Sequence, residues 1–187
     1  MEAALVAFGV VLVAELGDKS QLLALAFATR HPPVPVLIGI AVSTAALNAV
    51  SVAVGAAFAS ALPERSLGIA GGLAFLAFGV WTLRSDGDDE VSPMRQSAAP
   101  VVASVALAFL VAELGDKTMV ATITLAAQGS ALATWVGATV AMMAVNGVAV
   151  AVGRSLGARF PERSLRLAGA AVFLVFGVVL LSRGLLG

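Results

Sequence analysis

A hexapeptide with three ionisable residues occurs twice in this chain. The sequence Ala-Glu-Leu-Gly-Asp-Lys occupies residues 14–19 and again residues 112–117, each time within a long apolar stretch. The two copies place four carboxylates and two lysines where a charge is costly. Ionisable residues inside apolar segments are typical of ion or substrate sites, so the two copies predict one site built from two halves.

The motif and its neighbours offer oxygen ligands. Carboxylates, hydroxyls and carbonyls are hard donors that suit Ca²⁺, Mn²⁺ and Mg²⁺ better than Zn²⁺ or Cu⁺. Two asparagines at equivalent positions in later apolar segments extend this set. The predicted cation ligands are Glu15, Asp18, Glu113, Asp116, Ser20, Thr118, Asn48 and Asn146, with Lys19 and Lys117 as charge-compensating residues.

The charges of the two motifs predict exchange of a metal ion for protons. Two lysines and four carboxylates sum to 2 − 4 = −2 when all six groups are charged. One divalent cation or two protons neutralise that sum, so the carboxylates can change partner between metal and proton. The cation is then transported cargo, and no resident cofactor is predicted.

The local structure of the motif has two alternatives. On a continuous helix, Glu15, Asp18 and Lys19 lie near one face. A break at Gly17, and equally at Gly115, instead frees carbonyl groups to line a cavity.

One aligned pair near the motifs is chemically unlike. Gln21 corresponds to Met119, which offers only a soft thioether. If both side chains reach the site, Met119 favours Mn²⁺ over Ca²⁺.

The composition is that of an integral membrane protein. Of 187 residues, 60% are hydrophobic and 12% are charged, and the mean hydropathy is +1.02. A soluble domain carries about 25% charged residues. The chain has no cysteine and one histidine, which excludes thiolate chemistry and disfavours histidine-based metal sites. The net charge is zero, so nucleic acid is not a predicted partner.

Six apolar segments are long enough to cross a bilayer, since a spanning helix needs about 20 residues. The fold class predicted is an all-α integral membrane protein with six transmembrane helices, and its partners are the lipid bilayer, a divalent metal ion and protons. The predicted spans are residues 3–29, 35–61, 66–84, 99–127, 131–158 and 165–186.

The second half of the chain repeats the first at an offset of 113 − 15 = 98 residues. Residues 14–84 and 112–182 share 29 identities in 71 positions without a gap. Each copy holds three spans, an odd number, so the second copy enters the bilayer from the opposite side. Two inverted three-helix repeats are predicted, residues 1–84 and 99–187, joined by an acidic linker at 85–98, with the site at the repeat interface.

Basic residues predict the orientation, because cytoplasmic loops carry an excess of lysine and arginine. The linker then faces the cytoplasm and both termini face outward, in a multi-pass protein of the inner or plasma membrane. The basic side holds Arg30, Arg84, Arg95, Arg154, Arg159, Arg163 and Arg166, and the other side holds Arg65 and Arg183.

At the doubled motif the chain resembles the family of the Golgi manganese/calcium–proton exchanger, whose bacterial members include manganese exporters. The family pattern Glu-x-Gly-Asp-(Lys/Arg)-(Thr/Ser) is matched at every defined position by residues 15–20 and 113–118. The resemblance spans nearly the whole chain and includes the acidic linker. It implies a cation/proton antiporter whose motif acids bind Mn²⁺ or Ca²⁺, with the hydroxyls assisting. In a bacterium it implies efflux of manganese from the cytoplasm.

Other functions fit some of these features. An exporter of another small solute would share the size and the small-residue-rich spans. An intramembrane aspartyl enzyme would pair Asp18 with Asp116, although the adjacent lysines oppose a shared proton, and an enzyme is not predicted. The motif charges could also be structural, as ion pairs within each motif between Glu15 and Lys19 and between Glu113 and Lys117. A homodimer is an open alternative to a monomer.

Overall fold

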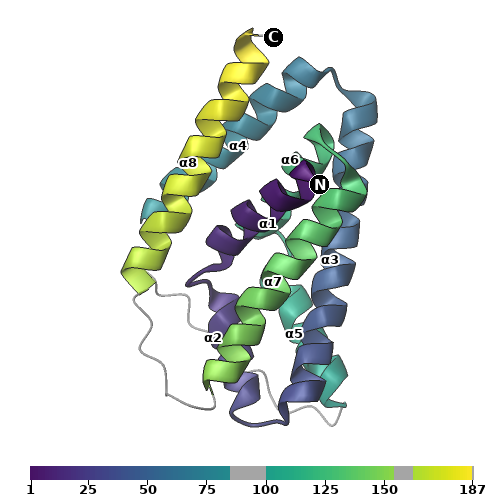
Figure 1. Cartoon of the computed structure of the whole chain (residues 1–187), viewed down its shortest axis with the longest axis vertical. Coiled ribbons are helices and arrows are strands. Elements are labelled where there is room, and N and C mark those ends of the chain that lie inside the picture. Colours follow the sequence, from purple (N-terminus) through teal and green to yellow (C-terminus); the bar gives the residue numbers. More distant parts are fainter. Residues whose placement is uncertain (85–99, 154–161, 187) are drawn as a thin grey trace.

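The structure is a computed structural model that describes residues 1–84, 100–153 and 162–186 (Figure 1). These ranges contain eight helices and no strand. The helices are α1 (Glu2–Glu15), α2 (Lys19–Ala28), α3 (Pro33–Ala61), α4 (Glu64–Arg84), α5 (Val101–Glu113), α6 (Lys117–Gln128), α7 (Ala131–Gly153) and α8 (Glu162–Leu186). The acidic linker at 85–98 lies outside the described residues, as do Arg95, Arg154 and Arg159.

Three described helices are long and apolar enough to cross a membrane by length and composition. They are Pro33–Ala61, Glu64–Arg84 and the stretch Ala131–Ala151 of α7. Two shorter stretches, Val101–Glu113 and Ala170–Leu186, are also apolar. These helices confirm the all-helical prediction and fit an integral membrane protein.

Of the two alternatives for the motifs, a continuous helix and a break at the glycine, the structure has the break. The expected segment 3–29 is divided into α1 and α2, and the expected segment 99–127 is divided into α5 and α6. Both divisions fall within the repeated motif. The motif acids therefore lie at helix ends, and the alternative in which they share one face of a continuous helix does not hold.

Helices α4 and α8 pack closely along their lengths (Figure 1). Gly68 lies against Gly184, Gly72 against Leu181 and Gly79 against Leu174, so the two helices run antiparallel. A Cβ atom at Gly72 would lie 2.6 Å from the Leu181 backbone nitrogen. The absence of a side chain at these positions permits the close approach, as is common between helices in membranes.

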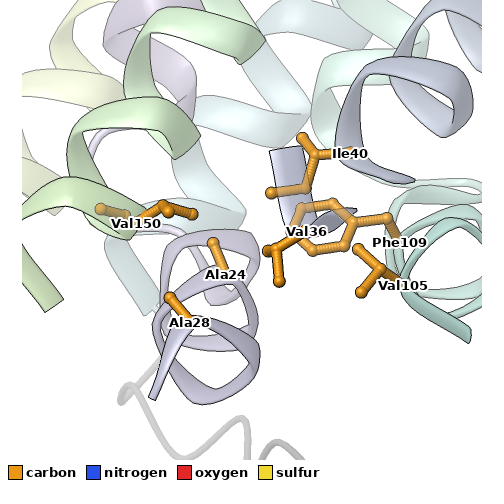
Figure 2. Packing of buried hydrophobic residues seen from close by; sticks show 8 residues of the cluster. Ala24, Ala28, Val36, Ile40, Val105, Phe109 and Val150 are labelled. Carbon is orange, nitrogen blue, oxygen red and sulfur yellow. The ribbon is translucent and has the colours of Figure 1, made fainter. Parts of the chain in front are cut away.

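A buried apolar cluster joins the half-helix α2 to helices α3, α5 and α7 (Figure 2). Figure 2 shows Phe109 and Val105 of α5 on one side and Val150 of α7 on the other, with Val36 between them. Between helices in a membrane such side chains associate through close van der Waals packing, because lipid tails are as apolar as the side chains themselves. The cluster therefore fixes α2 against both halves of the chain. Its members are Ala24, Ala28, Val36, Ile40, Val105, Phe109, Ala149 and Val150.

Contacts between the two halves are reciprocal at the 98-residue offset. Gly79 meets Leu174, and the counterpart Gly177 meets Leu76. The same relation holds for a second pair of counterpart glycines. Gly39 lies against the carbonyl of Val102, and Gly137 lies against the carbonyl of Ala4, the counterpart of Val102. Phe75 and its own counterpart Phe173 are in contact, with ring centroids 5.3 Å apart. Exchange of partners in this way is the mark of a two-fold relation between two units.

Candidate cation site

Each motif forms a tight turn between two helices. Helix α1 ends at Glu15, Leu16 is extended, and Gly17 has a φ of 78°. The Asp18 amide donates a hydrogen bond of 3.1 Å to the Glu15 carbonyl, and α2 begins at the next residue. This is a type II turn, whose third position requires a positive φ and therefore favours glycine.

The second motif has the same backbone. Helix α5 ends at Glu113, Gly115 has a φ of 79°, and the Asp116 amide donates a hydrogen bond of 3.1 Å to the Glu113 carbonyl. The break that the glycines allowed is therefore present in both copies. It leaves each glutamate at the end of one helix and each aspartate at the start of the next.

The two turns bring their acids together. One carboxylate oxygen from each of Glu15, Asp18 and Glu113 lies within 4.8 Å of the other two. Glu15 is fully buried, Glu113 is 2% exposed and Asp116 is 8% exposed. Three carboxylates at this separation, drawn from both halves, can surround a single cation.

Ion pairs cross between the motifs. Lys117 Nζ lies 2.6 Å from Asp18 Oδ1, and Lys19 Nζ lies 3.9 Å from Asp116 Oδ1. The structural alternative was an ion pair within each motif, between the glutamate and the lysine of the same copy. Neither of the two described ion pairs is of that kind. Each lysine instead lies at the aspartate of the other half, which leaves the two glutamates without a lysine partner at ion-pair distance.

Both motif hydroxyls donate to the same acid. Ser20 Oγ donates to Glu15 Oε2 at 2.8 Å, and Thr118 Oγ1 donates to Glu15 Oε1 at 2.5 Å. Thr118 belongs to the second motif, so this hydrogen bond joins the two halves. The acid of its own motif, Glu113, receives neither hydroxyl.

Several buried acceptors at the site have no donor among the described residues. They are both carboxylate oxygens of Glu113, Asp18 Oδ2 and Asp116 Oδ2. A buried acceptor without a partner costs about 1–3 kcal/mol, and more when it is charged. Such oxygens are suited to bind a cation or to carry a proton, which would supply the missing interaction.

The two predicted asparagine ligands make hydrogen bonds with residues of α7, Asn48 from α3 and Asn146 from within α7 itself. Asn48 Nδ2 of α3 donates to Thr139 Oγ1 at 3.2 Å and approaches Met142 Sδ at 3.7 Å. Asn146 Nδ2 donates to the Met142 carbonyl at 3.0 Å, and its buried Oδ1 has no donor within the described ranges. Hydrogen bonding between helices accounts for Asn48, and a ligand role for either asparagine stays a prediction.

Gln21 holds the first turn through its amide group, a role not predicted from the sequence. Its Nε2 donates to the Glu15 carbonyl at 3.1 Å, and its Oε1 accepts from the Gly17 amide at 3.3 Å. The available signal was its place four residues after Gly17, which is one helical turn. The counterpart Met119 accepts from the Gly115 amide through Sδ at 3.4 Å.

Comparison with known proteins adds independent information. A family model described as "Divalent cation/proton antiporter GDT1" matches residues 3–90 and 101–186. A Vibrio cholerae protein named "Putative manganese exporter" is 34% identical over 174 residues, which cover 90% of this chain and 84% of that protein. "GDT1-like protein sll0615" of Synechocystis is 33% identical over 190 residues, with 90% and 91% covered. "Protein PAM71, chloroplastic" of Arabidopsis thaliana is 32% identical over 203 residues, with 92% and 55% covered. No solved structure matches the chain significantly.

Proposed function

Because this chain belongs to the GDT1 family of divalent cation/proton antiporters, we propose that it exports Mn²⁺ from the cytoplasm in exchange for protons. The observation that carries the proposal is the meeting of Glu15, Asp18 and Glu113 within 4.8 Å, with acids from both motifs. Buried acceptors that lack a donor among the described residues complete the case.

The choice of cation rests on ligand chemistry and on one relative. Carboxylate and hydroxyl oxygens suit Mn²⁺ and Ca²⁺. The Vibrio cholerae relative is named as a manganese exporter, so Mn²⁺ is the first proposed substrate and Ca²⁺ the second. The proposed ligands are the clustered acids Glu15, Asp18 and Glu113, assisted by Ser20 and Thr118. Asp116 lies outside that cluster of three and is kept as a fourth ligand from the sequence motif, with its buried Oδ2 lacking a donor among the described residues.

The exchange follows from charge and coordination. The two lysines lie at the two aspartates, so the six groups together carry 2 − 4 = −2 when all are ionised. A metal ion binds carboxylates only in their deprotonated form, so its arrival releases protons. Two protons carried in one direction and one divalent cation in the other leave the site neutral in both loaded states.

The proposed topology is six spans in two inverted repeats, residues 1–84 and 99–187. In it, α1 with α2 forms the first span and α5 with α6 the fourth, as discontinuous helices of the kind found at transporter sites. The reciprocal contacts and the antiparallel course of the counterpart helices α4 and α8 support this arrangement. The linker at 85–98 then faces the cytoplasm and both termini face outward in the plasma membrane.

The ion pairs weigh against an aspartyl enzyme. In such an enzyme, Asp18 and Asp116 would share one proton, yet each lies beside a lysine of the other motif. A homodimer is a proposed assembly in addition to the monomer, and cross-linking in native membranes tests it.

The test is transport by purified protein in liposomes. Under an imposed pH gradient, Mn²⁺ should move against the protons, and Asp18→Asn or Asp116→Asn should abolish the flux while expression is preserved. Glu64→Gln is the matched control, because Glu64 is an exposed carboxylate at the start of α4, outside the motifs. Normal transport by both aspartate variants would reject the site, and transport of no divalent cation by the unmodified chain would reject the function.

A further inference from the structure

The two motif turns are held by side chains of different chemistry at counterpart positions. The Gly17 amide donates to Gln21 Oε1 at 3.3 Å, and the Gly115 amide donates to Met119 Sδ at 3.4 Å. Both contacts span four residues and meet the same backbone atom of the turn. The positions are therefore structurally equivalent, and only the side chain differs.

Gln21 makes a second contact that Met119 cannot make. Its Nε2 donates to the Glu15 carbonyl at 3.1 Å, so the amide group bridges the first and third residues of the turn. A thioether has no hydrogen to donate, so the Glu113 carbonyl receives no equivalent bond from Met119. Gln21 is 6% exposed, which shields this bridge from water.

The glutamate side chains show the same difference between halves. Ser20 and Thr118 both donate to Glu15. Both carboxylate oxygens of Glu113 are buried and accept no bond from the described residues. In the first half-site, hydrogen bonds from side chains hold both the turn backbone and the Glu15 carboxylate. In the second half-site, the turn has one such contact, and the Glu113 carboxylate has none from the described residues.

We propose that Met119 is a positioning residue that leaves the second motif turn free to reorganise during transport, while the Gln21 bridge keeps the first turn fixed. This inference rests on the proposed antiport, which requires the ligands around the cation to rearrange between the two access states. The Met119 sulfur accepts from the Gly115 amide, but the side chain has no donor for the Glu113 carbonyl. The absence of that second hydrogen bond is what leaves the turn free. It is not a cation ligand in this account.

The test installs the missing bridge. In Met119→Gln the new amide can bond the Gly115 amide and the Glu113 carbonyl, as Gln21 does in the first turn. Hydrogen exchange at the Gly115 and Asp116 amides should slow by about two- to tenfold, the ratio that one ordinary hydrogen bond corresponds to. Turnover in liposomes should fall by a similar factor, with no increase in the KM for Mn²⁺.

Met119→Leu is the matched variant, since it also lacks a donor. Its turnover should exceed that of Met119→Gln by at least about twofold on the same estimate, and exchange at Gly115 should not slow. Equal turnover of the two variants would overturn the inference. A changed preference between Mn²⁺ and the softer Cd²⁺ in both variants would overturn it too, because that result makes the sulfur a ligand.

Hydrogen exchange separates this inference from the proposed function, because it needs no transport. If the unmodified chain moves no Mn²⁺, the proposed function fails, whatever the exchange rates are. If exchange at Gly115 is the same in Met119→Gln and the unmodified chain, the inference fails even when transport is normal. Should Met119→Gln not fold, the reverse variant Gln21→Met must accelerate exchange at Gly17, and unaltered exchange there refutes the bridge.

Discussion

Lys117 lies 2.6 Å from the carboxylate of Asp18, so the lysine of the second motif pairs with the aspartate of the first. The reciprocal pair, Lys19 with Asp116, is longer at 3.9 Å. The lysine side chain is 14% exposed in the short pair and 34% exposed in the long one. The two pairs share a pattern but differ in their shielding from solvent.

Replacement of the two lysines should therefore have unequal effects. Lys117→Met leaves Asp18 without its cation in a buried setting and should cost about 3–5 kcal/mol of stability. Lys19→Met removes a longer contact from a lysine that is 34% exposed, so it should cost less than Lys117→Met even though Asp116 is itself buried. Thermal unfolding of the two purified variants in detergent measures the difference. Equal losses would contradict the distinction between the pairs.

The turn glycine Gly115 should not tolerate a side chain. Its φ of 79° is unfavourable for any other residue, and Gly115→Ala should cost about 1–2 kcal/mol and lower Mn²⁺ transport. A Cβ atom there would have no neighbour within 4 Å, so the loss reports the backbone conformation and not a clash.

Gly147→Ala is the control for that variant. Gly147 lies within α7, and its Cβ would also meet nothing within 4 Å. Alanine is favoured over glycine in a helix by about 0.5–1 kcal/mol, so this variant should be slightly more stable than the unmodified chain. If the two glycine variants behaved alike, the positive φ of the turn would not be important.

Stabilisation by Mn²⁺ should weaken as the pH is lowered from neutral. A cation that binds only the folded protein raises its stability, by about 2.7 kcal/mol at a hundredfold excess over Kd. Carboxylates must lose protons to bind the metal, so acid competes with Mn²⁺ at Glu15, Asp18 and Glu113. The melting temperature with and without Mn²⁺, measured at several pH values, gives the dependence.

The aspartate variants and the exposed-carboxylate control distinguish this competition from general acid effects. Asp116→Asn should lose most of the Mn²⁺-dependent shift at every pH, and Glu64→Gln should retain the shift and its pH dependence. A Mn²⁺ shift that does not vary with pH would speak against shared use of the site by metal and protons.

The meeting of the two motifs was predictable from the sequence. The 98-residue offset between two identical charged motifs predicted one site built from both copies, and Glu15 and Glu113 do lie together in the structure. The break at Gly17 was open from the sequence, because the flanking apolar residues also suit a continuous helix. The choice between the two depends in part on tertiary contacts, such as the hydrogen bond from Thr118 of the second motif to Glu15, that have no local sequence pattern.

The partners of the charged groups could not be predicted. Within one motif, Lys19 is four residues from Glu15, the usual spacing of a helical ion pair. The turn removes that geometry. Each lysine pairs instead with the aspartate of the other motif, Lys19 with Asp116 and Lys117 with Asp18. The unequal treatment of Glu15 and Glu113 by the hydroxyls is likewise a property of packing, because both acids have the same local sequence.

The reciprocal contacts affect how a duplicated chain can evolve. A substitution in one copy alters only one of two equivalent contacts, so the other copy keeps its own contact unchanged. Gln21 and Met119 are an instance of such divergence at a single pair of positions. A single chain that carries both copies can thus hold different residues at counterpart positions of one site, which two identical subunits could not do.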